Sequence, residues 1–117
     1  MTLPLTRETL AAAYDYLCAT PPFSRWHLPD SADVTFRVTR HRDRHAHYIR
    51  DAKGRHVIVV SANSIGRSIS LIETMAHEMV HLYQAEAGME NSAQHNAAFK
   101  KLAARVCAIH GFDAKMF

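Results

Sequence analysis

The sequence has little cysteine, no long apolar run and no leader-like start, and each absence excludes a class of protein. Its two cysteines, Cys18 and Cys107, are far apart and neither belongs to a Cys-x-x-Cys pair. This excludes a zinc ribbon and argues against a disulfide in a reducing compartment. No apolar run approaches the roughly 18 residues that span a bilayer. Residues 1–7 lack the basic-then-apolar pattern of a signal peptide, so we expect a cytoplasmic protein with no membrane association.

The sequence also contains no internal repeat and no low-complexity tract. A chain of 117 residues can bury one hydrophobic core but not two. We therefore expect a single domain over residues 1–117.

Charge is low overall but unevenly distributed. The formal net charge is +3, yet residues 37–56 carry seven Lys or Arg against two Asp, a local balance of +5 that leaves −2 for the rest. These basic residues are Arg37, Arg40, Arg42, Arg44, Arg50, Lys53 and Arg55. A solvated hairpin face explains such a cluster, and contact with DNA or another nucleic acid is the functional alternative.

The first half of the chain begins with a predicted helix over residues 6–19. Thr6 is a suitable N-cap, and the spacing of Leu10, Tyr14 and Leu17 gives the helix one apolar face. Pro21-Pro22 then prevents the helix from continuing. We interpret this segment as a packing helix.

Three short strands are predicted next, over residues 34–40, 45–50 and 57–60. The third is continuously apolar and β-branched, which indicates a central position in a sheet. Gly54 can supply a positive φ in the turn over residues 51–54, so the second and third strands should pair antiparallel. The predicted fold class is α+β, with a small three-stranded antiparallel sheet packed with three main helices.

Residues 71–84 contain His77, Glu78 and His81 in the His-Glu-x-x-His order that is typical of zinc hydrolases. At about 100° per residue, the apolar side chains of this segment fall within one arc about 160° wide. They are Ile72, Met75, Ala76, Met79, Val80, Leu82 and Tyr83. The two histidines fall opposite this arc, so a solvated helix face that happens to carry histidines is the alternative. Gly88 is expected to end the helix.

A catalytic zinc ion needs three protein ligands and an open position, so a third ligand must come from elsewhere in the chain. The last helix is predicted over residues 93–110, and His95 lies four residues before Phe99 and seven before Leu102. That spacing puts His95 on the inward stripe in the first turn, and we predict it as the third ligand, with a hydrogen-bonded core histidine as the alternative. Glu86 and Glu90 have weaker support, because one falls in the apolar arc and the other in a linker.

The segment His77-Glu78-Met79-Val80-His81, followed by His95-Asn96-Ala97-Ala98-Phe99, resembles the SprT-like domain of the SprT/Spartan metalloproteases. This resemblance implies a minimal zincin-like metalloprotease core with one Zn²⁺ per chain, bound by His77, His81 and His95. It also implies that Glu78 is the general base that activates the zinc-bound water for peptide-bond hydrolysis. Relatives commonly have Gly in place of Asn96, and Asn also tolerates a left-handed backbone. The zinc ribbon of many relatives is absent from these residues.

Two functions are open at this point. The first is a zinc-dependent endopeptidase that acts on a protein or peptide substrate, including DNA-associated proteins if the basic segment contacts DNA. The second is a zinc-stabilised module that binds nucleic acid or protein without protease activity. Glu78 favours the first, because a purely structural zinc site has no use for a carboxylate in the position of a base.

Overall fold

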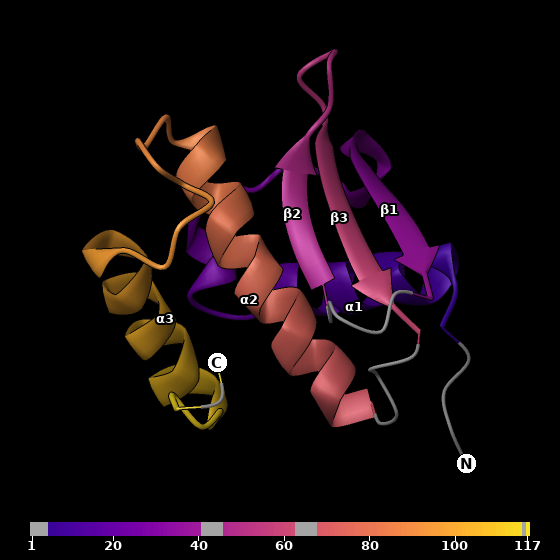
Figure 1. Cartoon of the computed structure of the whole chain (residues 1–117). Coiled ribbons are helices and arrows are strands. Elements are labelled where there is room, and N and C mark those ends of the chain that lie inside the picture. Colours follow the sequence, from indigo (N-terminus) through magenta and orange to yellow (C-terminus); the bar gives the residue numbers. More distant parts are fainter. Residues whose placement is uncertain (1–4, 41–45, 63–67, 116) are drawn as a thin grey trace.

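The computed structural model describes residues 5–40, 46–62, 68–115 and 117, although not the side chains of residues 68–70. Along the chain it contains α1 (Arg7–Cys18), the short 3₁₀ turns η1 (Phe23–Arg25) and η2 (Ser31–Asp33), and strands β1 (Val34–Thr39), β2 (Ala46–Arg50) and β3 (His56–Ser61). Helices α2 (Ser68–Glu86) and α3 (Ala97–His110) follow (Figure 1). The α+β class with three main helices and three strands is thus confirmed.

The sheet has the strand order β1-β3-β2, which confirms the central position of β3. Strands β2 and β3 form the expected antiparallel hairpin, in which Gly54 has a φ of 79°. The prediction of a fully antiparallel sheet was wrong, because β1 and β3 pair in parallel. The chain reverses direction after β1 and again after β2, so β1 and β3 run the same way. Because β3, the most apolar strand, is central, it lies next to β1, and the two strands pair in parallel.

Helix α1 packs on one face of the sheet, beside β1. Its predicted N-cap is confirmed, since Thr6 Oγ1 accepts a hydrogen bond from the Thr9 amide over 3.1 Å. The apolar stripe of α1 is fully buried and includes Tyr14, whose ring packs edge-on against Phe36 of β1 at 5.5 Å between centroids. The Tyr14 hydroxyl donates to the Pro29 carbonyl over 2.6 Å, which satisfies the polar end of this buried ring.

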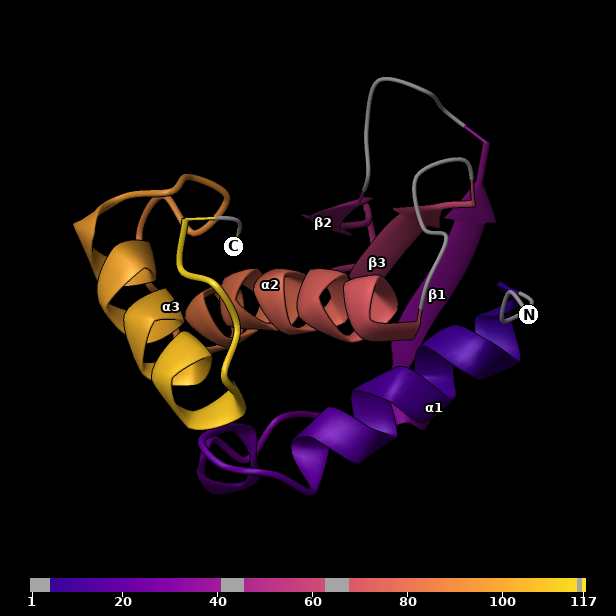
Figure 2. The ribbon, with the colours of Figure 1, turned by 90° about the horizontal axis from the view of Figure 1, so that it is seen from below.

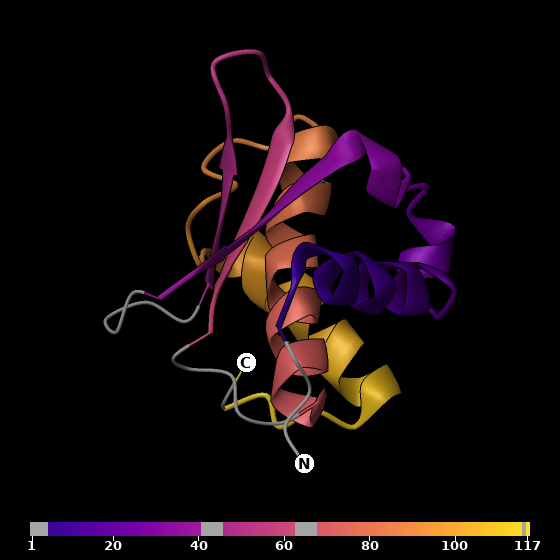
Figure 3. The same cartoon turned by 90° about the vertical axis from the view of Figure 1, so that its right-hand side faces the viewer.

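Helix α2 lies on the same face of the sheet as α1, beside β2, while α3 packs on the other side of α2, away from the sheet (Figures 2 and 3). Because neighbours surround it, α2 is buried over most of its surface, and Met75, Met79 and Leu82 are fully enclosed. The helix ends as predicted at a left-handed Gly88, with the Met89 amide donating to the Gln84 carbonyl. Among the helices that the structure describes, none is long and apolar enough to cross a membrane.

Helix α3 begins at Ala97, four residues later than predicted, and the preceding residues form a turning linker. Its N-cap is Asn96, whose Oδ1 accepts a hydrogen bond from the Phe99 amide over 3.0 Å. Asn96 has an extended backbone with φ −80° and ψ −174°, so this position does not use the left-handed conformation that Asn and Gly tolerate. An extended backbone is what an N-cap requires, and Asn caps more strongly than Gly.

Candidate metal centre

The His-Glu-x-x-His residues of α2 face α3 and the linker that precedes it. His81 is only 4% exposed and Glu78 only 5% exposed, whereas His77 is half-buried. The solvated helix face considered from the sequence is therefore excluded. The contacts of His77 and His81 with Phe99, and of His81 with the Ser92 carbonyl, place both histidines against α3 and the linker.

The three predicted metal ligands come together in the structure. One ligand atom from each of His77, His81 and His95 lies within 4.8 Å of the others, a grouping that could hold a metal ion. The Nε2 atoms of His77 and His95 are 3.1 Å apart. Two nitrogens bound to one tetrahedral zinc ion at 2.0–2.1 Å would be separated by about 3.3 Å. The described histidines are thus spaced as a metal ion requires.

Backbone carbonyls orient two of these imidazoles. His77 Nδ1 donates to the Phe117 carbonyl over 3.0 Å, and His81 Nδ1 donates to the Ser92 carbonyl over 2.7 Å. A carbonyl only accepts hydrogen bonds, so the proton of each neutral ring is on Nδ1 and the Nε2 lone pair is available to a metal. Neither carbonyl could be identified from the sequence, because every residue carries one.

Phe99, in the first turn of α3, forms a wall behind all three histidines. Its ring stacks on His81 at 4.4 Å and on His95 at 4.6 Å between centroids, and it contacts His77 at 5.0 Å. Phe99 is 3% exposed, so this wall is fixed by the packing of α3 on α2. The sequence placed Phe99 on the apolar stripe of a helix but did not indicate its contact with the metal ligands.

His95 reaches the site from a different local structure than predicted. It lies just before the N-cap Asn96 and is exposed, rather than within the first turn of the helix. The side chain of Asn96 also binds the linker, because its Nδ2 donates to the Asn91 carbonyl over 3.3 Å. The position of His95 therefore depends on the cap.

Burial sets the protonation of the site. It raises the pKa of Glu78 to about 8, which brings this carboxyl group close to neutral pH. It also lowers the pKa of His77 to about 4, with His81 and His95 adding to this effect, and it lowers the pKa of His81. A metal requires neutral imidazoles, so the two buried histidines are in the form that binds one.

The two competing carboxylates are not near the three histidines. Glu90 is exposed in the linker. Glu86 is exposed at the end of α2, where its Oε2 lies 2.6 Å from His56 Nε2 and 3.4 Å from Arg50. His56 is itself 6% exposed and its Nδ1 contacts the Tyr48 hydroxyl at 2.5 Å. Glu86 and Tyr48 thus contact both nitrogens of this buried imidazole.

The described basic residues proposed for nucleic-acid contact lie at different places along the sheet. Arg37 and Arg40 lie in or just after β1, whereas Lys53 and Arg55 lie in the hairpin turn at the opposite end of the sheet (Figure 1). The length of β3, about 20 Å, separates these ends. Two of the basic side chains are in ion pairs, Arg50 with Glu86 and Arg55 with Asp51. Arg42 and Arg44 lie outside the described residues.

Comparison with known proteins gives one match. A sequence model of the SprT-like family matches residues 22–116, which include the sheet, α2, the linker and α3. No curated protein and no solved structure matches the chain.

Proposed function

The chain belongs to the SprT-like family, which makes it a domain of metalloprotease type, and from this premise we propose that it is a zinc-dependent endopeptidase. In this proposal His77, His81 and His95 bind one Zn²⁺, and Glu78 is the general base. The observation that supports it best is the convergence of three histidine ligand atoms within 4.8 Å of one another.

The donor set fits catalytic zinc better than structural zinc. Imidazole nitrogen is a preferred ligand of Zn²⁺, and catalytic sites use three protein ligands where structural sites use four. Among the described residues, the group around His77 and His81 contains three donors, the third being His95. This count favours an open site and disfavours a closed structural zinc.

A bound zinc ion would supply a Lewis acid that acidifies water and polarises the scissile carbonyl. Glu78 precedes His81 by three residues on α2 and is buried, so its carboxylate is shielded from competing solvent. Burial raises the pKa of Glu78 to about 8 in the metal-free protein, and the charge of a nearby Zn²⁺ would favour the ionised carboxylate. In that form Glu78 can accept a proton from the attacking water and later donate it to the leaving amine.

Replacing Glu78 tests the proposal. Glu78→Gln keeps the shape of the side chain but removes the base, so cleavage of an unfolded generic protein such as casein should be lost while zinc content stays at one per chain. Glu90→Gln, an exposed carboxylate in the linker, is the matched control and should cleave normally. If Glu78→Gln cleaves as fast as the parent protein, Glu78 is not the general base and the mechanism is wrong. Normal zinc content with no cleavage by the parent protein would favour the zinc-stabilised binding module.

DNA contact is a separate proposal. Arg37 and Arg40 belong to β1 and the residues just after it, whereas Lys53 and Arg55 lie in the β2–β3 turn, so the two groups can be tested separately. Reversing both charges, Arg37→Glu with Arg40→Glu, should weaken DNA binding and flatten its dependence on salt, since each lost phosphate contact changes the slope by about 0.9. Reversing Lys53 and Arg55 at the other end should have a smaller effect. If the parent protein does not bind DNA at low salt, the proposal fails.

A further inference from the structure

A cavity of about 330 Å³ lies beside the candidate metal centre. Its walls are one side of α3 and the segment that follows this helix, and they include His95, Phe99, Lys100, Ala103, Ala104 and Phe117. Three of these residues already belong to the metal centre. His95 is a candidate ligand, Phe99 stacks on the histidines, and Phe117 provides the carbonyl that orients His77. The cavity therefore shares part of its lining with the candidate metal centre.

The chemistry of the walls indicates what the cavity accepts. The rings of Phe99 and Phe117 form apolar walls, and alanines at positions 103 and 104 leave the space between them unfilled. Ligand pockets have volumes of about 300–1,000 Å³, and this cavity is near the lower end of that range. It is therefore large enough for one large side chain but too small for a helix or strand. Lys100 lines the cavity and is exposed, so its charged end is a cation at the edge of an otherwise apolar space.

We propose that this cavity is the specificity subsite of the protease, and that it takes an aliphatic or aromatic side chain of a substrate residue close to the scissile bond. The proposal rests on the proposed function, because the metal centre fixes where the scissile bond lies. A peptide bound at the metal would pass close to His95, which lines this cavity. Lys100 makes a lysine or arginine side chain unfavourable at the same subsite, because like charges repel.

The test uses hydroxamates, which chelate zinc through two oxygens, on the zinc-loaded protein. Acetohydroxamate measures access to the metal alone, and hydroxamates with an isobutyl or benzyl arm measure the cavity as well. Burying such an arm should tighten binding about ten- to a hundredfold. Ala104→Phe fills the cavity from an exposed position of α3 and should remove this gain without changing the affinity for acetohydroxamate.

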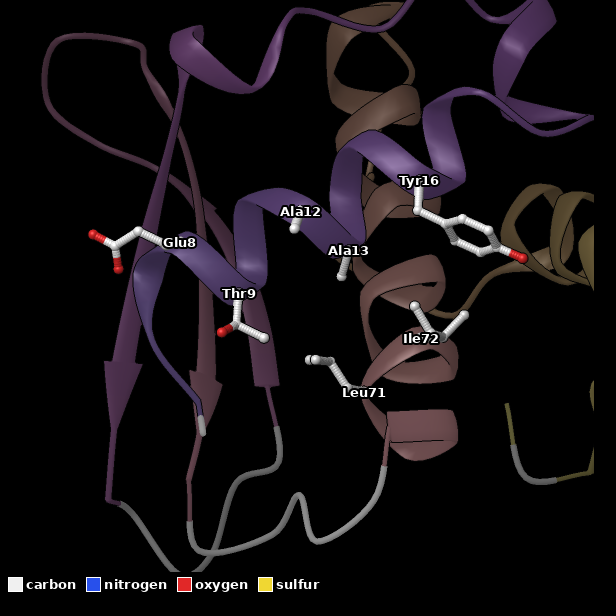
Figure 4. A pocket seen from close by; sticks show the side chains of 7 residues that line it. All are labelled: Glu8, Thr9, Ala12, Ala13, Tyr16, Leu71 and Ile72. Carbon is white, nitrogen blue, oxygen red and sulfur yellow. The ribbon is translucent and has the colours of Figure 1, made fainter. Parts of the chain in front are cut away.

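Ala12→Phe is the matched control. Ala12 is an exposed alanine on a helix that lines another apolar hollow, of about 480 Å³, between α1 and the start of α2 (Figure 4). This variant should keep the full gain from the apolar arm. A second variant, Lys100→Glu, leaves the packing unchanged and should improve binding of a hydroxamate with an aminobutyl arm relative to the parent protein.

The outcomes separate the subsite from the function on which it rests. If acetohydroxamate binds but the apolar arms add nothing, or if Ala104→Phe keeps their gain, the subsite is overturned and the zinc protease stands. If acetohydroxamate does not bind a zinc-loaded protein, the open metal site itself is overturned. A gain that Ala104→Phe removes and Ala12→Phe keeps supports the subsite.

Discussion

The backbone amide of Phe99 donates to Asn96 Oδ1 over 3.0 Å, and this hydrogen bond starts α3 immediately after the third candidate ligand. It links two parts of the metal centre, because His95 precedes Asn96 and the Phe99 ring stacks on the histidines. The N-cap is thus a structural device that also positions the site. A change at Asn96 should affect stability and metal binding together.

Asn96→Ala should destabilise the protein by about 1 kcal/mol, since Ala provides no acceptor for the Phe99 amide. It should also weaken zinc binding, because the chain that carries His95 is less firmly held. Asn96→Gly is the informative comparison. Gly is a good N-cap in an extended conformation, so its cost should be only a few tenths of a kcal/mol. Denaturant unfolding and competition with a zinc chelator measure the two effects, and equal losses in both variants would contradict the capping role.

His95→Ala should remove one of three zinc ligands. Its effect on zinc affinity should exceed the about 10- to 100-fold that follows loss of a group that merely orients a ligand. Zinc stabilises only the folded chain that binds it, so the difference in melting temperature between zinc-loaded and metal-free protein should shrink as well. His27→Asn is a suitable control, because His27 is exposed with a φ of 53° that Asn also adopts. An unchanged metal content in His95→Ala would remove this residue from the site.

The stability of the metal-free protein should depend on pH through three groups of the candidate metal centre. Burial lowers the pKa of His77 to about 4 and also that of His81, so between about pH 4 and 6.5 the unfolded chain binds more protons and stability rises with pH. The raised pKa of Glu78, about 8, acts in the opposite direction, because the folded chain keeps a proton that the unfolded chain loses above about pH 4.5. Above about pH 6.5 both histidines are neutral in the folded and the unfolded chain, so of these three groups only Glu78 still binds a different number of protons in the two states.

Stability of the metal-free protein should therefore fall between about pH 6.5 and 8, by at most about 1.4 kcal/mol per pH unit. Glu78→Gln has no titrating group at this position and should abolish the decline. Urea unfolding in the presence of a chelator, repeated across this pH range, measures the effect. A decline of the same size in Glu78→Gln would mean that another group causes it.

The sequence contained enough information for much of the fold and for the grouping of the three histidines. Helical periodicity located α1 and α2, and the spacing of His95 from Phe99 indicated a residue that does lie beside His77 and His81, even though the helix boundary was wrong. Local patterns identify elements well because side-chain periodicity follows directly from backbone geometry. They identify helix starts less well when a linker of similar composition precedes the cap.

The remaining features depend on contacts between distant segments. The stacking of Phe99 on His81 follows from the docking of α3 on α2, and the orientation of His77 depends on a carbonyl forty residues away. Backbone groups carry no sequence signal, so such partners become visible only in three dimensions. The parallel pairing of β1 with β3 is similar, because it depends on strand order and not on the residues within either strand.

The contact between His56 and Glu86 gives a prediction outside the metal centre. His56 Nε2 lies 2.6 Å from Glu86 Oε2 and joins the sheet to the end of α2, whereas its Nδ1 contacts the Tyr48 hydroxyl. Glu86→Ala should leave one polar atom of a buried ring without this partner and cost about 1 kcal/mol, a modest value because Glu86 is half-exposed. Glu90→Ala removes an exposed carboxylate of the nearby linker and should be close to neutral. Zinc affinity should be unchanged in both variants, since neither carboxylate is near the three histidines. A loss of zinc binding in Glu86→Ala would show that the register of α2 against the sheet, and not only its contact with α3, controls the metal centre.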